Sequence, residues 1–519
     1  MNILTSVWIP VELANGEVAR LAIKDIPGSG ALRVAHPRAD FSALITEMLV
    51  TIFQSLAAPA DDRERLKRLS APAEVDFSWI AENEKHFELF GEGSRFLQSP
   101  VPLGEESGAG ALVYEAPGAN TLKKNADFFV SRHQFARACP CCATAGLFLN
   151  QAHARQGGSG YFVTRRGGSA LTALLEAPTL WETITLNLLN RSSYEQKYCF
   201  EDGEGFPWTH GTAAFTKSSL GPAEVGRHVA LWWMPLALYL HVRDNPDALT
   251  CSLCGEASAQ MVTAVSRTAT KARPSTAFEH PLTVWFAPDP KKSAEGSIPL
   301  QVPSAGFFLD EWFALTLGVG QRSNSGPVLG ALPAIAKLPR SRAASVKLWL
   351  AGKSMKINSL LFDYEERAPV ICAETPESQE ALVGVARTLS DEFATVLAKL
   401  RKALIDSLDG TLNRASSQVL ADFSSFAHAK VREMLARIAA IPDFDAVDVL
   451  LSQEDFESFS QQLRSMAARL FEQALELSHL EQEVLRKVLE HQSSFHKSLF
   501  AKASAKKAKS ATNSTKAVA

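Results

Sequence analysis

The chain has 519 residues, of which 46% are hydrophobic, and its formal net charge is −3 at pH 7. The length and hydrophobic fraction are typical of a globular protein with about two to four domains. The negative net charge excludes a protein that is basic throughout, so any contact with nucleic acid must be local. The apolar run Val229–Leu240 contains Pro235 and is shorter than the roughly 20 residues that span a bilayer, and no secretory signal precedes it. We therefore expect a cytoplasmic protein without a membrane segment.

The N-terminal third predicts a hairpin followed by helices. Asn15-Gly16 joins two β-rich runs, and this dipeptide indicates a tight turn in which both residues have positive φ. Helical periodicity follows over Phe41–Leu56, and Asp61-Asp62 is typical of the start of a charged helix. The Gly- and Glu-rich segment 104–118 predicts an exposed loop, and Thr179–Leu189 predicts another helix.

The remainder of the chain divides into three parts that differ in composition and in hydrophobic periodicity. Residues 194–376 carry many prolines, glycines and tryptophans and short β-like runs, which indicates one large irregular α+β domain over 1–376. Over 377–500, four amphipathic segments with short connections predict a C-terminal four-helix bundle. The third of these helices has a capping start at Ser452 and Asp455. The tail 501–519 has five lysines and no acid, which is typical of disorder.

Two CxxC pairs are the clearest chemical motif. Cys139 and Cys142 form the first pair, and Cys251 and Cys254 form the second. In a reducing cytoplasm clustered cysteines indicate metal ligands rather than disulfides, and two such pairs are the usual way to build a tetrahedral zinc site. Four thiolates leave no open coordination position, so the predicted Zn²⁺ is structural. The alternative is that these are unpaired buried cysteines.

Three stretches lack acids but carry several lysines and arginines, namely 128–175, 257–278 and 312–362. The first contains the flexible run Gly157, Gly158, Ser159 and Gly160, whose backbone N–H groups can approach a polyanion closely. Such segregation of charge suits phosphate backbones. The alternative is that these cations face acids from other parts of the fold.

Motifs for catalysis are missing from the sequence. It contains no GxxxxGK[ST], no HExxH and no GxSxG, and Pro140-Cys141-Cys142 does not satisfy the PCxxC of zinc deaminases. We therefore expect a protein that is not an enzyme.

Several segments together resemble one family, CasA, the large subunit of the type I-E CRISPR surveillance complex Cascade. The resemblance is carried by the opening Asn2-Ile3-Leu4 through Trp8-Ile9-Pro10-Val11, the two cysteine pairs, the glycine run, and the further matches Arg166-Gly167-Gly168, Leu186-Asn187 and His280-Pro281. They occur in the family's order over nearly the whole chain.

The resemblance implies a function as well as a fold. CasA proteins have an N-terminal α+β domain and a C-terminal four-helix bundle, and they cleave nothing themselves. They recognise the protospacer-adjacent motif (PAM) of double-stranded target DNA, help to open the duplex for the guide RNA, and recruit a helicase-nuclease. The implied partners are the other Cascade subunits, CRISPR RNA, target DNA and that effector.

The resemblance also implies roles for individual residues. Residues 157–160 correspond to the loop that enters the minor groove, and Lys271 to the lysine that contacts it. Lys356, Ile357 and Asn358 correspond to the wedge that separates the strands, although the glutamine of some relatives is not found there. An apolar Ile357 can still unstack a base step. Phe129, Val130, Ser131 and Arg132 correspond to the loop that anchors the subunit to the 5′ handle of the guide RNA and to nearby subunits.

Two other functions fit the same residues. One is a zinc-stabilised nucleic-acid-binding protein outside CRISPR defence, and the other is a metal-dependent enzyme. Metal exchange separates the enzyme from the binding proteins, because a catalytic site keeps an exchangeable ligand whereas a four-thiolate site has none.

Overall fold

The computed structural model describes residues 1–155, 166, 168–270, 273–274, 278–286, 298–302, 312, 315–316, 345–356, 359–370, 376–407, 414–439, 451–476 and 482–500. They form two compact units. The first lies within Met1–Ser304 and Ala314–Cys372, and the second within Ala305–Phe313 and Ala373–Ala519.

The predicted hairpin is present at the start of the first unit, with a different turn. β1 (Ile9–Glu12) pairs antiparallel with β2 (Val18–Leu21), and β3 (Arg33–Val34) pairs with the other edge of β1. Gly16 has a φ of +82°, but Asn15 is not among the residues with positive φ. The expectation that both turn residues are left-handed is therefore wrong. The loop is longer than two residues, since the Leu13 amide donates to the Glu17 carbonyl, and such loops need a left-handed residue only at their last position.

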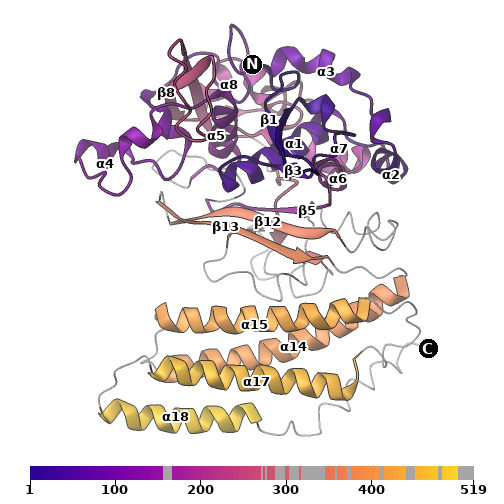
Figure 1. Ribbon diagram of the computed structural model, residues 1–519, viewed down its shortest axis with the longest axis vertical. Helices are drawn as coiled ribbons and strands as arrows, with labels where there is room; N and C mark the ends of the chain where they lie inside the picture. Colours follow the sequence, from indigo (N-terminus) through magenta and orange to yellow (C-terminus); the bar gives the residue numbers. More distant parts are fainter. Residues whose placement is uncertain are drawn as a thin grey trace. The chain divides into compact units, whose positions relative to one another are not determined.

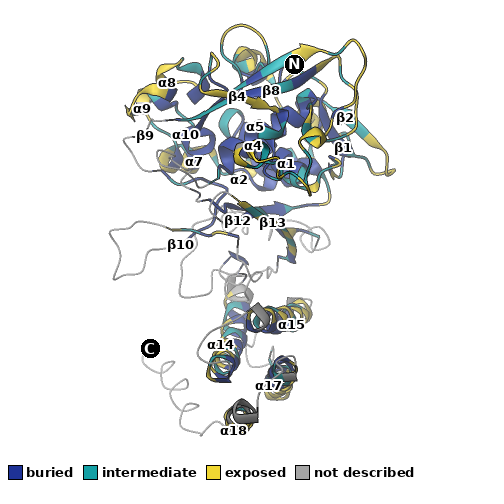
Figure 2. Ribbon diagram, turned by 90° about the vertical axis from the view of Figure 1, so that its left-hand side faces the viewer, coloured by how far each residue is buried: buried dark blue, intermediate teal, exposed yellow. Residues whose placement is uncertain are grey.

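Two apolar helices form the centre of the first unit. α1 (Ala39–Leu56) packs against α5 (Pro140–Ala152) and α6 (Leu180–Leu186). The helices predicted over 41–56 and 179–189 are thus present, although the second ends at Leu186. Figure 2 shows the dark-blue, buried residues of α1 and α5 enclosed by more exposed elements. Within the described residues α1 is the one helix long and apolar enough to cross a membrane, and its place in this core accounts for that composition.

Shorter helices surround this centre. They are α2 (Asp62–Ser70), α3 (Ser78–Asn83), α4 (Ala119–Lys123), α7 (Arg191–Tyr198), α8 (Ala213–Thr216), α9 (Pro222–Val225) and α10 (Val229–Trp232). Asp61 caps α2 by accepting a hydrogen bond from the Glu64 amide, so the start predicted at 61–62 is confirmed.

Two three-stranded sheets position the regions of functional interest (Figure 1). One has the order β4 (Glu105–Gly108), β8 (Gln260–Ala269), β7 (Leu236–Asp244), and the other has the order β13 (Ser359–Pro369), β12 (Lys347–Lys356), β5 (Leu171–Glu176). Two short pairs complete the strands: β6 (Ser219–Leu220) with β9 (Arg273–Pro274), and β10 (Trp285–Phe286) with β11 (Ile298–Pro299). The expectation of an exposed loop over 104–118 is wrong in part, because β4 pairs with β8 and Leu112 to Tyr114 are buried.

The second unit is helical. α14 (Pro376–Ser407) packs against α15 (Arg414–Ala439), α17 (Gln453–Glu476) and α18 (Gln482–Phe500). Leu389, Phe393 and Leu400 of α14 are buried, and the Phe393 ring stacks on Phe423 of α15. The Ser452 hydroxyl accepts a hydrogen bond from the Asp455 amide at the start of α17. The predicted fold class, an α+β body with a C-terminal helical bundle, is confirmed; the tail 501–519 lies outside the described residues.

Candidate metal centre and nucleic-acid groove

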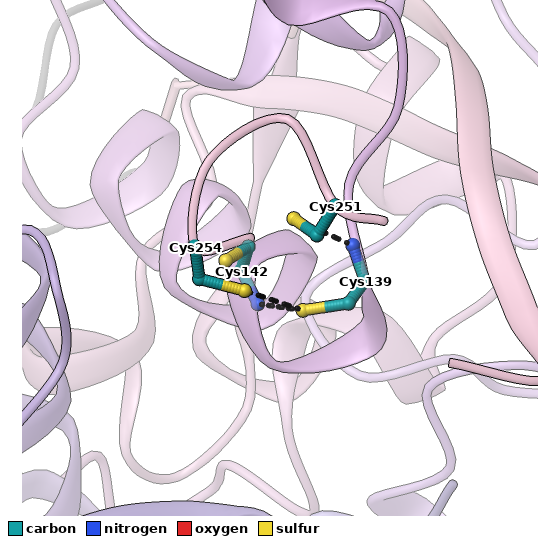
Figure 3. A group of neighbouring side chains, drawn as sticks. All are labelled: Cys139, Cys142, Cys251 and Cys254. Carbon is teal, nitrogen blue, oxygen red and sulfur yellow. Dashed lines mark hydrogen bonds between the residues drawn. The ribbon is translucent and has the colours of Figure 1, made fainter. Parts of the chain in front are cut away.

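Two distant segments bring four cysteines together. Cys139 is the N-cap of α5, Pro140 takes the first helical position, and Cys142 lies in the first turn. Cys251 and Cys254 lie on the loop between β7 and β8, which turns at Gly255 with a φ of +80°. Ala138 pairs with Val262 of β8 in both directions, which fixes the two segments side by side. In Figure 3 the four sulfur atoms turn toward one common space.

The geometry of this cysteine tetrad suits a tetrahedral metal ion. All four Sγ atoms lie within 4.8 Å of one another, and Cys139 Sγ is 3.6 Å from Cys254 Sγ. Metal–sulfur bonds of about 2.3 Å at tetrahedral angles place the sulfurs about 3.8 Å apart. The Cys139 amide donates to Cys251 Sγ at 3.2 Å, and the Cys142 amide donates to Cys139 Sγ at 3.5 Å. Because N–H donors and a helix N-terminus favour thiolates, the tetrad has the donor set to hold a metal ion.

Cys141 is adjacent in sequence but does not belong to the tetrad. Its side chain is buried on the same helix, and burial raises the pKa of its thiol to about 11.

His36 is a neighbour of the tetrad that the sequence does not reveal. Its Nδ1 accepts a hydrogen bond from the Arg38 amide at 3.0 Å, and its Nε2 lies 3.2 Å from Cys142 Sγ. Burial lowers the pKa of His36 to about 4, so the ring is neutral and its single proton is on Nε2. His36 therefore donates to the Cys142 sulfur, as residues around metal ligands commonly do. Neither spacing nor a motif links His36 to Cys142, which is 106 positions away.

Most of the residues expected to contact DNA lie outside the described part of the chain. This applies to Gly157, Gly158, Ser159, Gly160, Lys271, Ile357 and Asn358, while Lys356 is described only as the last residue of β12. Their described neighbours are informative. Arg155 lies two residues before the glycine run, and Arg267 lies on β8 four residues before Lys271.

Arg155 and Arg267 line one groove of about 850 Å³, together with Arg132. The Arg155 guanidinium lies 4.1 Å from the centre of the Tyr114 ring and donates to the Val113 carbonyl. Glu105 and Glu106 of β4 also line the groove. The first CxxC pair leads into α5, at whose far end Arg155 lies, and the second pair leads into β8. The cysteine tetrad thus joins α5, which Arg155 follows, to β8, which carries Arg267, while residues 105–122 supply most of the groove lining.

A buried ion pair fixes the chain just after the glycine run. Arg166 is 1% exposed, and its Nη1 lies 2.6 Å from Glu47 Oε1 of α1. Thr172 and Thr283 accept from the same guanidinium, and His153 Nε2 lies 2.9 Å from Glu47 Oε2. Burial lowers the pKa of His153, so its ring is neutral and donates to the carboxylate. Arg166 is therefore part of a structural turn rather than a phosphate ligand.

The loop 126–131 exposes two aromatic rings. Phe128 is 84% exposed and Phe129 is 99% exposed. At the base of the loop, the Arg132 guanidinium donates to Asp127 at 2.8 Å and to Asn125 at 3.0 Å. Arg132 thus closes the loop, and the open contact surface is provided by the rings.

The alternative explanation of the acid-free stretches holds for three of their cations. Arg132 pairs with Asp127, Arg166 with Glu47, and Lys353 with Asp40 and Asp363, and these acids lie outside the stretches. For these residues the expected excess of positive charge is neutralised in the fold. Arg155 and Arg267 line the groove together with the acids Glu105 and Glu106.

Comparisons with known proteins agree with this architecture. The model of the family described as CRISPR-associated protein Cse1 matches residues 2–470. No curated protein sequence matches the chain. Among solved structures, CasA (Cse1) of Thermus thermophilus is 15% identical with a TM-score of 0.64, over 96% of this chain and 99% of that one. Cse1 of Thermobifida fusca is 14% identical with a TM-score of 0.67, over 96% and 97%.

A chain of a structure titled CRISPR RNA-guided surveillance complex is similar as well. It is 14% identical with a TM-score of 0.66, and the match covers 95% of this chain and 99% of that chain. These likenesses extend over both units, and the family match begins at Asn2 and ends within α17. This chain belongs to the Cse1 family of CRISPR-associated proteins.

Proposed function

We propose that the chain is the non-catalytic large subunit of an RNA-guided CRISPR surveillance complex of the cytoplasm. In this role it binds the PAM of double-stranded DNA, helps to open the duplex and recruits a helicase-nuclease. Membership of the Cse1 family supports the proposal, as does the likeness over almost the full length to a chain of a CRISPR RNA-guided surveillance complex.

The observation that carries the proposal is the shared groove of Arg155 and Arg267. Residues 157–160 follow Arg155 and Lys271 follows Arg267, so two segments proposed to contact DNA start from the walls of one groove. Glycine-rich backbone can approach phosphates closely, and arginines and lysines neutralise them. In this proposal residues 157–160 and Lys271 contact the PAM in the minor groove, and Lys356, Ile357 and Asn358 form the wedge.

We propose that the exposed rings of the loop 126–131 anchor the chain to the guide RNA and neighbouring subunits. Aromatic side chains bind unpaired RNA bases by stacking, and an unstacked ring such as Phe129 is free to do so. Val130 and Ser131 continue the loop, and Arg132 holds its base closed.

We propose that the cysteine tetrad binds Zn²⁺ in a structural role. Four thiolates at tetrahedral spacing are the preferred ligand set of structural zinc and leave no position for a substrate. Cys139, Cys142, Cys251 and Cys254 would hold the ion, and His36 would orient the Cys142 sulfur.

Substitution of His36 tests the arrangement around the metal. His36→Ala removes the donor to Cys142 Sγ, and we expect zinc affinity to fall by about 10- to 100-fold. The measurement is competition for zinc with a chromophoric chelator. His133→Ala, which removes an exposed histidine, is the control and should leave the affinity unchanged. Equal affinities of His36→Ala and the unaltered chain would contradict the proposed contact.

Charge reversal at Lys271 tests the proposed PAM contact. Lys271→Glu should weaken binding of a duplex with a PAM by roughly tenfold or more, since one base contact contributes about 1–3 kcal/mol. The measurement is the affinity of the reconstituted complex for target duplexes with and without a PAM, at physiological salt.

The control is Lys24→Glu, which reverses the charge of an exposed lysine on a different segment. It should preserve the difference between the two duplexes. If Lys271→Glu binds the PAM duplex as tightly as the unaltered chain does, Lys271 is not the PAM contact.

A further inference from the structure

The hairpin β12–β13 is supported by the sheet over only part of its length. β12 pairs with β5 from Lys347 to Gly352. Beyond Gly352, β13 is its only strand partner within the described residues, and the register shifts between Ser354 and Met355. In the part of the chain that the structure describes, no strand therefore pairs with the other edge of β12 near the hairpin tip.

Lys353 is the first residue beyond the end of the β5 pairing, and its side chain is only 6% exposed. Its Nζ lies 2.5 Å from Asp363, the residue opposite it on β13, and 2.8 Å from Asp40 in the first turn of α1. Asp40 also accepts from Arg38 at 2.8 Å, and Arg38 pairs with Glu115. An ion-pair chain of Asp363, Lys353, Asp40, Arg38 and Glu115 thus links the hairpin to α1.

Apolar packing between the hairpin and α1 is interrupted at this point by a cavity of about 400 Å³. Asp40, Glu47, His153, Lys353 and Asp363 are among the residues that line it. A second polar contact lies closer to the tip, where the Met355 amide donates to Ser169 Oγ at 3.0 Å. Met355 and Leu360 also pack against the apolar core, and the polar contacts add a directional constraint that apolar packing alone does not give.

Burial of Asp40 makes this link strong. Burial alone raises the pKa of a carboxyl group, but the charges of Lys353 and Arg38 outweigh it and lower the pKa of Asp40. Asp40 therefore stays ionised at neutral pH. A buried, doubly paired carboxylate constrains its partners far more than an exposed ion pair does.

We propose that Lys353 is a positioning residue that sets the hairpin tip for duplex opening. The inference rests on the proposed function, in which Lys356, Ile357 and Asn358 form the wedge. Lys353 does not contact DNA; its charge is taken up by Asp40 and Asp363, and it acts by fixing the strands β12 and β13 that lead to these three residues.

The experiment compares two target duplexes in the reconstituted complex with the full chain. One target is fully paired, and the other is already unpaired beside the PAM. Opening is followed with a fluorescent base analogue next to the PAM. Lys353→Met, which keeps the length of the side chain and removes its charge, should open the paired target about tenfold more slowly. On the target already unpaired beside the PAM, it should act at the rate of the unaltered chain. Its affinity for the PAM duplex should stay within about twofold of that of the unaltered chain.

Three further variants separate positioning from folding. Lys353→Arg keeps the charge and should open the paired target at the rate of the unaltered chain. Asp40→Asn removes the partner on α1 and should slow opening as much as Lys353→Met does. The double variant Asp40→Asn with Lys353→Met should open the paired target no more slowly than either single variant. Lys347→Met removes an exposed lysine from the β5-paired end of the same strand and should change nothing. Metal content and melting temperature of each variant are measured in parallel.

The outcomes distinguish this inference from the proposed function. If the unaltered chain shows no PAM dependence, the proposed function fails. If it shows PAM dependence but Lys353→Met and Asp40→Asn open the paired target at the unaltered rate, the positioning role is overturned. Equal slowing on the paired and unpaired targets also overturns it, because hairpin placement matters only while the strands are paired.

Discussion

Replacing Cys142 with alanine is expected to release the metal and to lower the melting temperature of the first unit by about 5 °C or more. The tetrad joins α5 to the loop that leads into β8, and a bound metal ion stabilises only the folded arrangement. A ligand present at a thousand times its dissociation constant adds about 4 kcal/mol to the free energy of unfolding. Structural zinc binds more tightly than this requires, so about 4 kcal/mol is a lower bound.

Tryptophan fluorescence measures this effect selectively. Eight of the nine tryptophans belong to the first unit, and Trp312 belongs to the second. Circular dichroism adds the signal of the long helices α14, α15, α17 and α18. We expect loss of the metal to lower the midpoint temperature of the transition seen by fluorescence. The midpoint temperature of the helical transition seen by circular dichroism should shift much less.

Cys141→Ala is the matched control. Cys141 is next to Cys142 on the same helix and is also buried, but it is not a member of the tetrad. It should retain one zinc ion per chain by elemental analysis, while Cys142→Ala loses zinc on dialysis against a chelator. If both variants melt at the same temperature, or if the unaltered chain contains no zinc, the tetrad is not a zinc site.

Local patterns in the sequence predicted the elements that depend on local physics. A CxxC pair places two thiols on one turn, so each half of the tetrad is visible in the sequence. The C-terminal helices follow from apolar residues at helical spacing, which α14 buries at Leu389, Phe393 and Leu400. These features need no knowledge of the rest of the fold.

Features that depend on tertiary pairing could not be predicted in this way. β4 has the sequence Glu-Glu-Ser-Gly, which lacks β-forming residues, and it is a strand because the edge of β8 offers it hydrogen bonds. Lys353 and Arg166 stand in acid-free stretches, yet Asp40 and Glu47, which pair with them, come from α1, which is remote in sequence. The second partner of Lys353, Asp363, comes from β13. A charge count along the chain cannot detect such neutralisation, because it ignores which segments the fold brings together.

Replacing Arg166 with methionine should destabilise the first unit by about 3–5 kcal/mol, because it leaves the Glu47 carboxylate buried without a cation. Burial alone raises the pKa of Glu47, but the charge of Arg166 and the hydrogen bond from His153 outweigh it and hold the pKa well below its usual range. The contribution of Glu47 to stability is therefore present above about pH 4 and is lost as the pH falls through the lowered value.

In Arg166→Met the contribution of Glu47 to stability changes with pH in the opposite direction. Without the guanidinium, burial raises the pKa of Glu47, and protonation then relieves the unpaired charge. The deficit of the variant relative to the unaltered chain should consequently be smaller at pH 5 than at pH 8. Urea unfolding followed by tryptophan fluorescence at the two pH values measures the difference.

Two controls separate charge burial from loss of packing. The double variant Glu47→Leu with Arg166→Met removes both charges and should be more stable than Arg166→Met alone. Arg33→Met breaks the exposed pair with Glu12 and should cost less than about 1 kcal/mol. If the double variant is less stable than Arg166→Met, or if the deficit is independent of pH, the loss comes from packing. In that case the ion pair does not hold the chain that follows the glycine run.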